Sequence, residues 1–144
     1  MTTLAHPTSS TLADSAAGAA RTRRLRTLLQ ADAAYCGVFG AGAALAAPAA
    51  ADLLGPDVST TVVRIVGIIL VVWALDAALL SRTSGRLLTH TATAAAAGNI
   101  AWEVATIVLI AMGAFSTGGA VLALGIAAIA GVLGLLQIRA VRGR

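Results

Sequence analysis

Residues Thr61 to Leu80 read TVVRIVGIILVVWALDAALL, and this stretch decides the fold class of the chain. At 1.5 Å per residue, a helix of this length crosses the roughly 30 Å of hydrocarbon in a bilayer. Three further apolar stretches surround it, over about residues 31–54, 89–113 and 118–138. The sequence therefore predicts an all-α protein, a bundle of four transmembrane helices joined by short loops, in which neighbouring helices pack antiparallel.

The overall composition agrees with a protein whose solvent is lipid. Hydrophobic residues make up 58% of the 144 residues and charged residues only 11%, whereas soluble domains carry about a quarter charged residues. The arginines flank apolar stretches instead of lining one face, which argues against binding to nucleic acid. The expected partner is the lipid bilayer, and a second copy of the chain or another membrane protein is the alternative partner.

The distribution of arginine predicts the orientation of the chain, which contains no lysine. Basic residues gather on the cytoplasmic side of membrane proteins. Nine arginines flank the apolar stretches at three places: Arg21, Arg23, Arg24 and Arg26; Arg82 and Arg86; Arg139, Arg142 and Arg144. We therefore expect a multi-pass protein of the plasma membrane with both termini in the cytoplasm. Arg64, inside an apolar stretch, is the exception.

The N-terminal region divides into two predicted parts. Residues 1–26 are rich in Ser, Thr and Ala, which predicts a disordered cytoplasmic tail that ends in a basic block, and residues 27–144 form the transmembrane domain. The stretch 31–54 is the weakest helix, because Pro48 removes a backbone donor. A cleaved signal of the secretory or twin-arginine kind is the alternative. Asp32 inside the stretch favours an inserted helix.

Four residues form a predicted intramembrane polar cluster: Arg64, Asn99, Glu103 and Thr106. At helical spacing Asn99, Glu103 and Thr106 share one face with Ala92 and Ala95. A charged group at mid-membrane costs on the order of 3 kcal/mol or more, so this face is predicted to point into the bundle. Arg64 is the predicted ion-pair partner of Glu103, serving either as a lock between helices or as part of a transport or binding site.

Two further carboxylates, Asp32 and Asp76, lie near the predicted cytoplasmic helix ends. We interpret them as interfacial groups that reach Arg26, Arg82 or Arg86 by snorkelling, with an acidic mouth leading to Glu103 as the alternative. The two tryptophans, Trp73 and Trp102, are predicted to pack in the core or to line a cavity.

Motifs for catalysis are missing from the sequence. It has no phosphate-binding loop, no HExxH or CxxC pattern and no GxSxG elbow. Cys36 is the only cysteine, which rules out an internal disulfide and offers no metal cluster. We expect no catalytic residues, no metal and no cofactor. Small residues spaced by four, such as Gly37 with Ala41 and Ala127 with Gly131, predict close helix packing within the bundle or in a homodimer.

Three short motifs resemble those of the small four-helix integral membrane proteins common in GC-rich Gram-positive bacteria: Arg64-Ile65-Val66-Gly67, Asn99 with Trp102, and Gln137-Ile138-Arg139. The chain is similar to the DoxX-like proteins in size and topology alone. The resemblance implies a membrane location and assigns no functional residue. The predicted function is that of a non-enzymatic structural or accessory membrane protein, and the alternative is a small proton-coupled transporter or ligand-binding protein that uses Glu103.

Overall fold

The computed structural model describes the backbone of residues 9–143 and the side chains of residues 15–143. This part of the chain folds into five helices and no strands: α1 (Ser9–Leu45), α2 (Ala47–Leu54), α3 (Thr60–Leu80), α4 (Gly85–Ala111) and α5 (Thr117–Arg142). The helices α1, α3, α4 and α5 are long and apolar enough to cross a membrane, with the candidate span of α1 running over Ser15–Leu45. The predicted all-α bundle of four spanning helices is confirmed, and the chain is a small multi-pass membrane protein.

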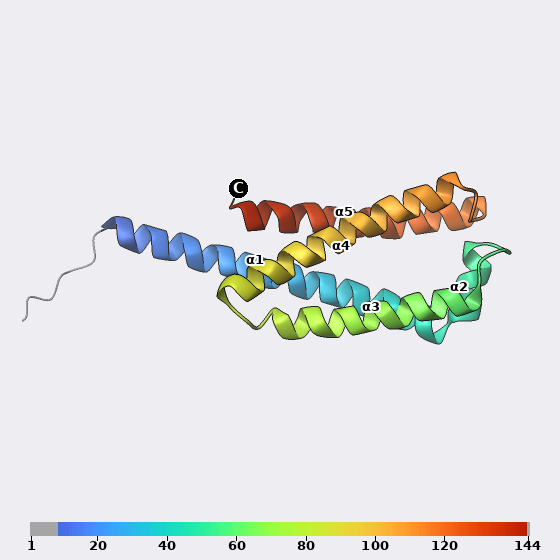
Figure 1. Ribbon diagram of the computed structural model, residues 1–144, viewed down its shortest axis with the longest axis horizontal. Helices are drawn as coiled ribbons and strands as arrows, with labels where there is room; N and C mark the ends of the chain where they lie inside the picture. The colour runs from blue at the N-terminus through green and yellow to red at the C-terminus, as the bar shows by residue number, and fades with distance from the viewer. Residues whose placement is uncertain (1–8, 144) are drawn as a thin grey trace, which may run out of the picture.

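The bundle consists of two antiparallel helix pairs (Figure 1). The first pair is α1 with α3, and the second is α4 with α5; within each pair the helices contact each other along much of their length. Contacts between the pairs are sparser, and α3 touches α4 at few points although only a short loop joins them. The interior between the two pairs is therefore the place where a cavity can form.

The helix bounds lie within a few residues of those predicted for α3, α4 and α5. The predicted helix 31–54, in contrast, is two helices, because the chain breaks at Ala46, which has φ −109° and ψ 33°. Pro48 lies in the first turn of α2. A proline ring clashes with the carbonyl four residues earlier, so the long helix ends before Pro48, and proline is well accepted in the first turn of the new helix, where its missing N–H needs no partner.

The structure also differs from the expected disordered tail, because α1 already begins at Ser9. Residues 9–26 of the predicted tail are thus helical, and residues 1–8 lie outside the described residues. Alanine and arginine are strong helix formers. Leu25 and Leu29 also bury their side chains, with exposed fractions of 2% and 0%, so α1 joins the bundle at these residues, whereas residues 15–20 are exposed.

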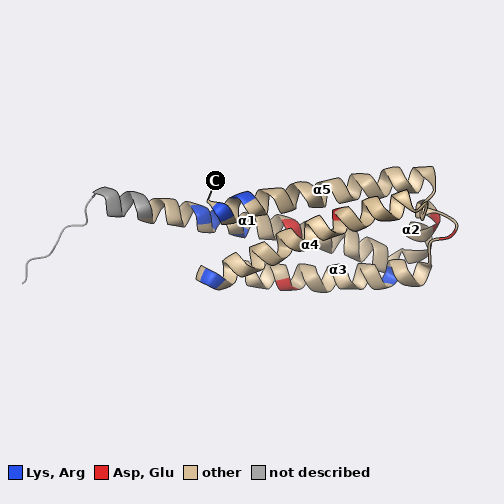
Figure 2. Cartoon of the chain, turned by 45° about the horizontal axis from the view of Figure 1, so that its top comes forward, with Lys and Arg blue, Asp and Glu red and all other residues tan. Residues whose placement is uncertain are grey.

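The three basic flanks meet at one end of the bundle, which we call the basic end (Figure 2). Arg21 donates from Nε to the carbonyl of Ala140 at 3.2 Å and from Nη2 to that of Val141. Arg26 donates from Nη2 to the carbonyl of Thr83 at 2.9 Å. These bonds join the start of α1 to the end of α5 and to the α3–α4 loop. The N-terminal flank and the C-terminal flank thus lie on the same side, and the cytoplasmic assignment stays a prediction.

Glycine allows a close contact between the backbones of α1 and α3. A Cβ on Gly40 would lie 2.8 Å from the carbonyl oxygen of Gly67, and a Cβ on Gly67 would collide with the backbone of Ala43 and Ala44. Backbone atoms cannot move aside as a flexible side chain can. The two helices therefore cross at this pair of glycines, a geometry that small residues permit in membranes.

Candidate functional site

Four polar side chains, one from each spanning helix, meet inside the bundle; we call them the polar network. They are Asp32 of α1, Trp73 of α3, Asn99 of α4 and Gln137 of α5. Asn99 Nδ2 donates to Asp32 Oδ1 at 2.8 Å and to Gln137 Oε1 at 3.3 Å. Trp73 Nε1 donates to Asp32 Oδ2 at 3.4 Å. The network thus joins the two helix pairs through side-chain hydrogen bonds.

Both oxygens of Asp32 have hydrogen-bond partners, although its side chain is fully buried with an exposed fraction of 0%. A buried carboxyl group without partners is costly, and two donors from other helices lower that cost. Gln137, also 0% exposed, is different because its Nε2 has no partner among the described residues. The amide of Asn99 is held on its nitrogen side only, and its Oδ1 accepts no hydrogen bond from the described residues.

Asp32 occupies the inward face of α1 because of its spacing. Leu29, Asp32 and Cys36 follow one another at intervals of three and four residues, and all three are buried. Helical periodicity therefore fixes the carboxyl group in the interior, and it cannot be turned outward without moving Leu29 and Cys36 to lipid.

A cavity of about 290 Å³ lies beside the polar network, between the two helix pairs. Its walls are almost wholly apolar. Aromatic side chains form one part of the wall and small residues of α4 form another: Tyr35, Phe39, Trp73 and Trp102; Ala94, Ala95 and Gly98. Asn99 is part of the wall as well. A mostly apolar hollow with a few fixed polar groups is the usual form of a small-molecule site.

The cavity reaches the outer surface of the bundle. Trp102, Phe39 and Ile69 all line it, and their exposed fractions are 38%, 37% and 60%. In a membrane protein this surface faces the lipid tails, so a molecule dissolved in the bilayer can reach the cavity.

Tyr35 holds the wall of the cavity in place, because its hydroxyl donates a hydrogen bond to the carbonyl of Ile126 on α5 at 2.5 Å.

The inward face predicted for α4 is confirmed. Ala92, Ala95, Asn99 and Thr106 are buried, with exposed fractions of 0%, 1%, 7% and 5%. The Thr106 hydroxyl donates to the carbonyl of Trp102 on its own helix at 2.9 Å, so it is no partner of a charged group. Glu103 is half-buried on this face, and its carboxylate lies directly against Gly131 of α5.

The predicted ion pair between Arg64 and Glu103 is not formed. Arg64 is exposed, and Glu103 faces α5, whereas Arg64 is on α3. Side chains tilt toward the N-terminus of their own helix, and α3 and α4 run antiparallel. The two side chains therefore point toward opposite ends of the bundle, which widens the gap that they were expected to span.

The two cytoplasmic-side carboxylates have different positions from those expected. Asp32 has no contact with Arg26, whose Nη2 instead donates to Thr83, so the interfacial ion pair predicted for Asp32 is wrong. Asp76 is exposed and forms no ion pair with an arginine among the described residues. The physical reason is helix phase: Asp32 shares the buried face of α1, whereas Asp76 lies on the outer face of α3.

Gln137 was not among the expected site residues. The signal that could have identified it is simple, because it is the only amide or charged side chain between Ala120 and Ile138. An isolated polar group in an apolar helix usually faces the bundle interior. Trp73, predicted as packing or as a cavity wall, proves to be a hydrogen-bond donor as well, and Trp102 is too exposed for a core residue.

Comparisons of the chain with protein-family models, with curated proteins and with solved structures find no match. The site must therefore be interpreted from its own geometry. That geometry provides apolar contacts, the side chain of Asn99 in the cavity wall and a route from the lipid phase.

Proposed function

We propose that this chain is a non-enzymatic membrane protein that binds a small, mostly apolar molecule between its two helix pairs. The observation that carries the proposal is the apolar cavity of about 290 Å³ whose wall includes Asn99. The volume is close to the lower limit of known ligand sites, which suits a compact ring system or part of an acyl chain. The ligand would enter from the lipid phase, because several residues of the cavity wall are exposed on the outer surface of the bundle.

Asn99 gives the site its polar specificity. Its Nδ2 group is occupied by Asp32 and Gln137, which hold the amide plane in place and leave Oδ1 free to accept. A ligand with one N–H or O–H group in an otherwise apolar frame would meet this oxygen. Asp32 is then a positioning residue, because it orients Asn99 without touching the ligand. Glu103 does not line the cavity, so we build no transport mechanism on it.

The ligand-binding proposal is tested by filling the cavity. Gly98 lines it, and a Cβ added there would meet no atom within 4 Å, so Gly98→Leu places a side chain in the space. Gly125 of α5 is a matched control, because it is exposed, equally open at its Cβ and outside the cavity wall. The probe is 1-aminoanthracene, an apolar ring with one amino group, added to the protein in detergent.

Binding is measured by energy transfer from Trp73 and Trp102, the chain's two tryptophans, both of which line the cavity. We expect Gly98→Leu to weaken binding at least tenfold and Gly125→Leu to leave it unchanged. Anthracene, which lacks the amino group, should bind about fivefold more weakly than the amine, since one hydrogen bond is worth about 1 kcal/mol. Equal affinities for the wild-type protein and both variants would show that the probe binds elsewhere.

A structural or accessory role is the second candidate, and a specific observation favours it. The polar network links all four spanning helices, and each oxygen of Asp32 is satisfied by a different helix. The sole role of polar links of this kind can be to fix how the helices pack. In that case the cavity would be a packing defect filled by lipid. For both candidates we propose the plasma membrane as the location, with both termini in the cytoplasm.

A further inference from the structure

A second hollow, of about 530 Å³, lies at the basic end between α1 and the start of α4. We call it the basic pocket. Arg21, Arg86 and His90 line it, and no carboxylate does. The side chains that the structure describes at this end, those of residues 15–26, 81–90 and 137–143, include no Asp or Glu. The described side chains around the pocket therefore carry unbalanced positive charge.

The two arginines of the basic pocket have complementary properties. The guanidinium of Arg21 is held in place by the carbonyls of Ala140 and Val141, which occupy only part of its five N–H groups. Arg86 is exposed and has no hydrogen-bond partner among the described residues. One fixed guanidinium and one free guanidinium can bind the same phosphate group, which arginine recognises through two parallel N–H donors.

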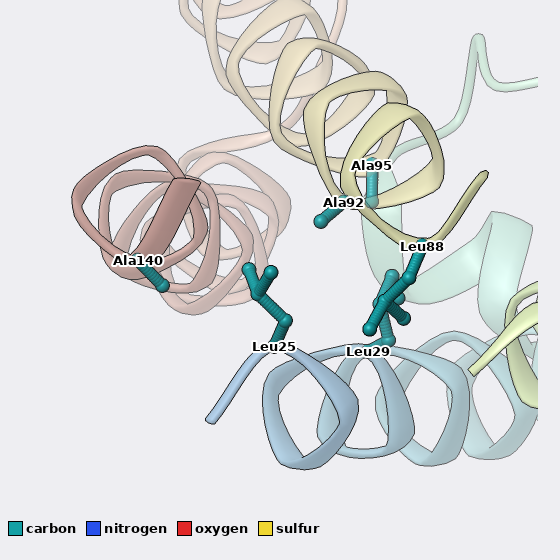
Figure 3. Close-up of a cluster of buried hydrophobic side chains, with 6 residues drawn as sticks. All are labelled: Leu25, Leu29, Leu88, Ala92, Ala95 and Ala140. Carbon is teal, nitrogen blue, oxygen red and sulfur yellow. The ribbon is translucent and has the colours of Figure 1, made fainter. Parts of the chain in front are cut away.

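The floor of the basic pocket is apolar. Leu25 and Leu88 line it and are 2% and 1% exposed. They belong to a buried cluster that continues along the bundle through Leu29 and Ala92 (Figure 3). Charge at the rim and hydrocarbon beneath it match the boundary between lipid headgroups and tails, where the ends of spanning helices lie.

We propose that the basic pocket binds the phosphate headgroup of an anionic phospholipid. The occupant is a lipid because the pocket lies at the end of four spanning helices and because its floor is apolar. The opposite end of the bundle carries exposed Asp52 on α2, exposed Asp57 in the α2–α3 loop and a single arginine, Arg64, among the described residues, so the clustered positive charge that such a lipid needs is present at one end only. This site is separate from the cavity beside Asn99.

The test counts lipid molecules bound to the purified protein by native mass spectrometry. The probes are dioleoylphosphatidylglycerol, dioleoylphosphatidylcholine and inorganic phosphate. Arg86→Gln removes a guanidinium that has no structural partner, so this variant should fold normally. The double variant, Arg21→Gln with Arg86→Gln, removes both guanidinium groups of the pocket. The matched control, Arg23→Gln with Arg142→Gln, removes the same charge from exposed residues at the same end that do not line the pocket.

We expect Arg86→Gln to weaken phosphatidylglycerol binding about fivefold and the double variant about twenty-five-fold, since each guanidinium that donates a hydrogen bond to the phosphate contributes roughly a fivefold factor. The control should change binding less than twofold. Three results would overturn the proposal. They are an equal loss in the control pair, equal binding of phosphatidylcholine, and displacement of the lipid by inorganic phosphate, which would identify an ion site instead.

Discussion

At the scale of the residue, Asp32 has the most demanding position in the chain. Its carboxyl group is fully buried, and Asn99 and Trp73 each donate to one of its oxygens. Removing the side chain of Asp32 or of Asn99 leaves the remaining partner with an unpaired buried polar group, which costs about 1–3 kcal/mol. In membrane proteins the coupling between two such partners is smaller, on average about 0.6 kcal/mol and at most about 1.7.

The first prediction is therefore a coupling of about 1 kcal/mol between Asp32→Ala and Asn99→Ala. The measurement is a double-mutant cycle on the free energy of unfolding in mixed micelles. Asp76→Ala is the control partner, because Asp76 is an exposed aspartate outside the network, and its cycle with Asn99→Ala should give no coupling. Additive effects in the Asp32 cycle would contradict the network.

The sequence could predict part of this site. Helical spacing placed Asn99 on an inward face, and that is correct because a face is a local property of one helix. Which residues meet across helices depends on the rotation of each helix about its axis and on the relative depth of the helices in the membrane. Neither quantity can be derived from the sequence of one helix. Asp32 and Gln137 therefore could not be matched to Asn99 by spacing. The Arg64–Glu103 pair was inferred from depth and is not formed, because Arg64 is exposed on α3 and Glu103 faces α5.

At the scale of the element, the crossing of α1 and α3 depends on Gly40 and Gly67. The second prediction is that Gly67→Ala lowers the free energy of unfolding by about 1–3 kcal/mol, as overpacking does, because its Cβ would collide with the backbone of α1. Gly42→Ala is the matched control on α1, since a Cβ there meets no atom within 4 Å. It should be neutral or stabilising, because alanine favours helix more than glycine.

Unfolding in mixed micelles followed by circular dichroism measures both glycine variants. A loss of stability in Gly42→Ala as large as in Gly67→Ala would mean that the close approach of the two backbones does not determine the stability.

The positions of the helices could be predicted from the sequence, because each span needs a minimum apolar length. The close approach at Gly67 could not be predicted, because a glycine in the sequence does not indicate which neighbouring backbone it will face. The break at Ala46 was foreseeable from Pro48, yet its effect on the helix was underestimated.

At the scale of the whole molecule, the arginine pattern and the fold give the same arrangement. The three arginine-rich flanks are far apart in sequence, and the helix pairs bring them to one end, where Arg21 and Arg26 bond to α5 and to the α3–α4 loop (Figure 2). The topology could be predicted because every span reverses the direction of the chain. Which helices pair could not, because α3 and α4 are consecutive and yet touch little.

The third prediction concerns the side of the membrane on which the basic end lies. Ser59 and Ser84 precede α3 and α4, are exposed, and make no side-chain bond as helix caps, so each tolerates replacement by cysteine. They lie at opposite ends of the bundle. The native Cys36 is buried with an exposed fraction of 4%, so it gives little background. The reagent is a maleimide that does not cross membranes, added to intact cells.

The positive-inside rule predicts labelling of Ser59→Cys in intact cells and labelling of Ser84→Cys only after the cells are permeabilised. The reverse pattern would keep the fold and invert the orientation, and the basic pocket would then face the outer leaflet. Labelling of both variants from outside would mean that one span is not inserted, since Ser59 and Ser84 are separated by α3 alone. The position of the basic end decides which leaflet can supply the anionic lipid, so this measurement also sets the conditions for testing the basic pocket.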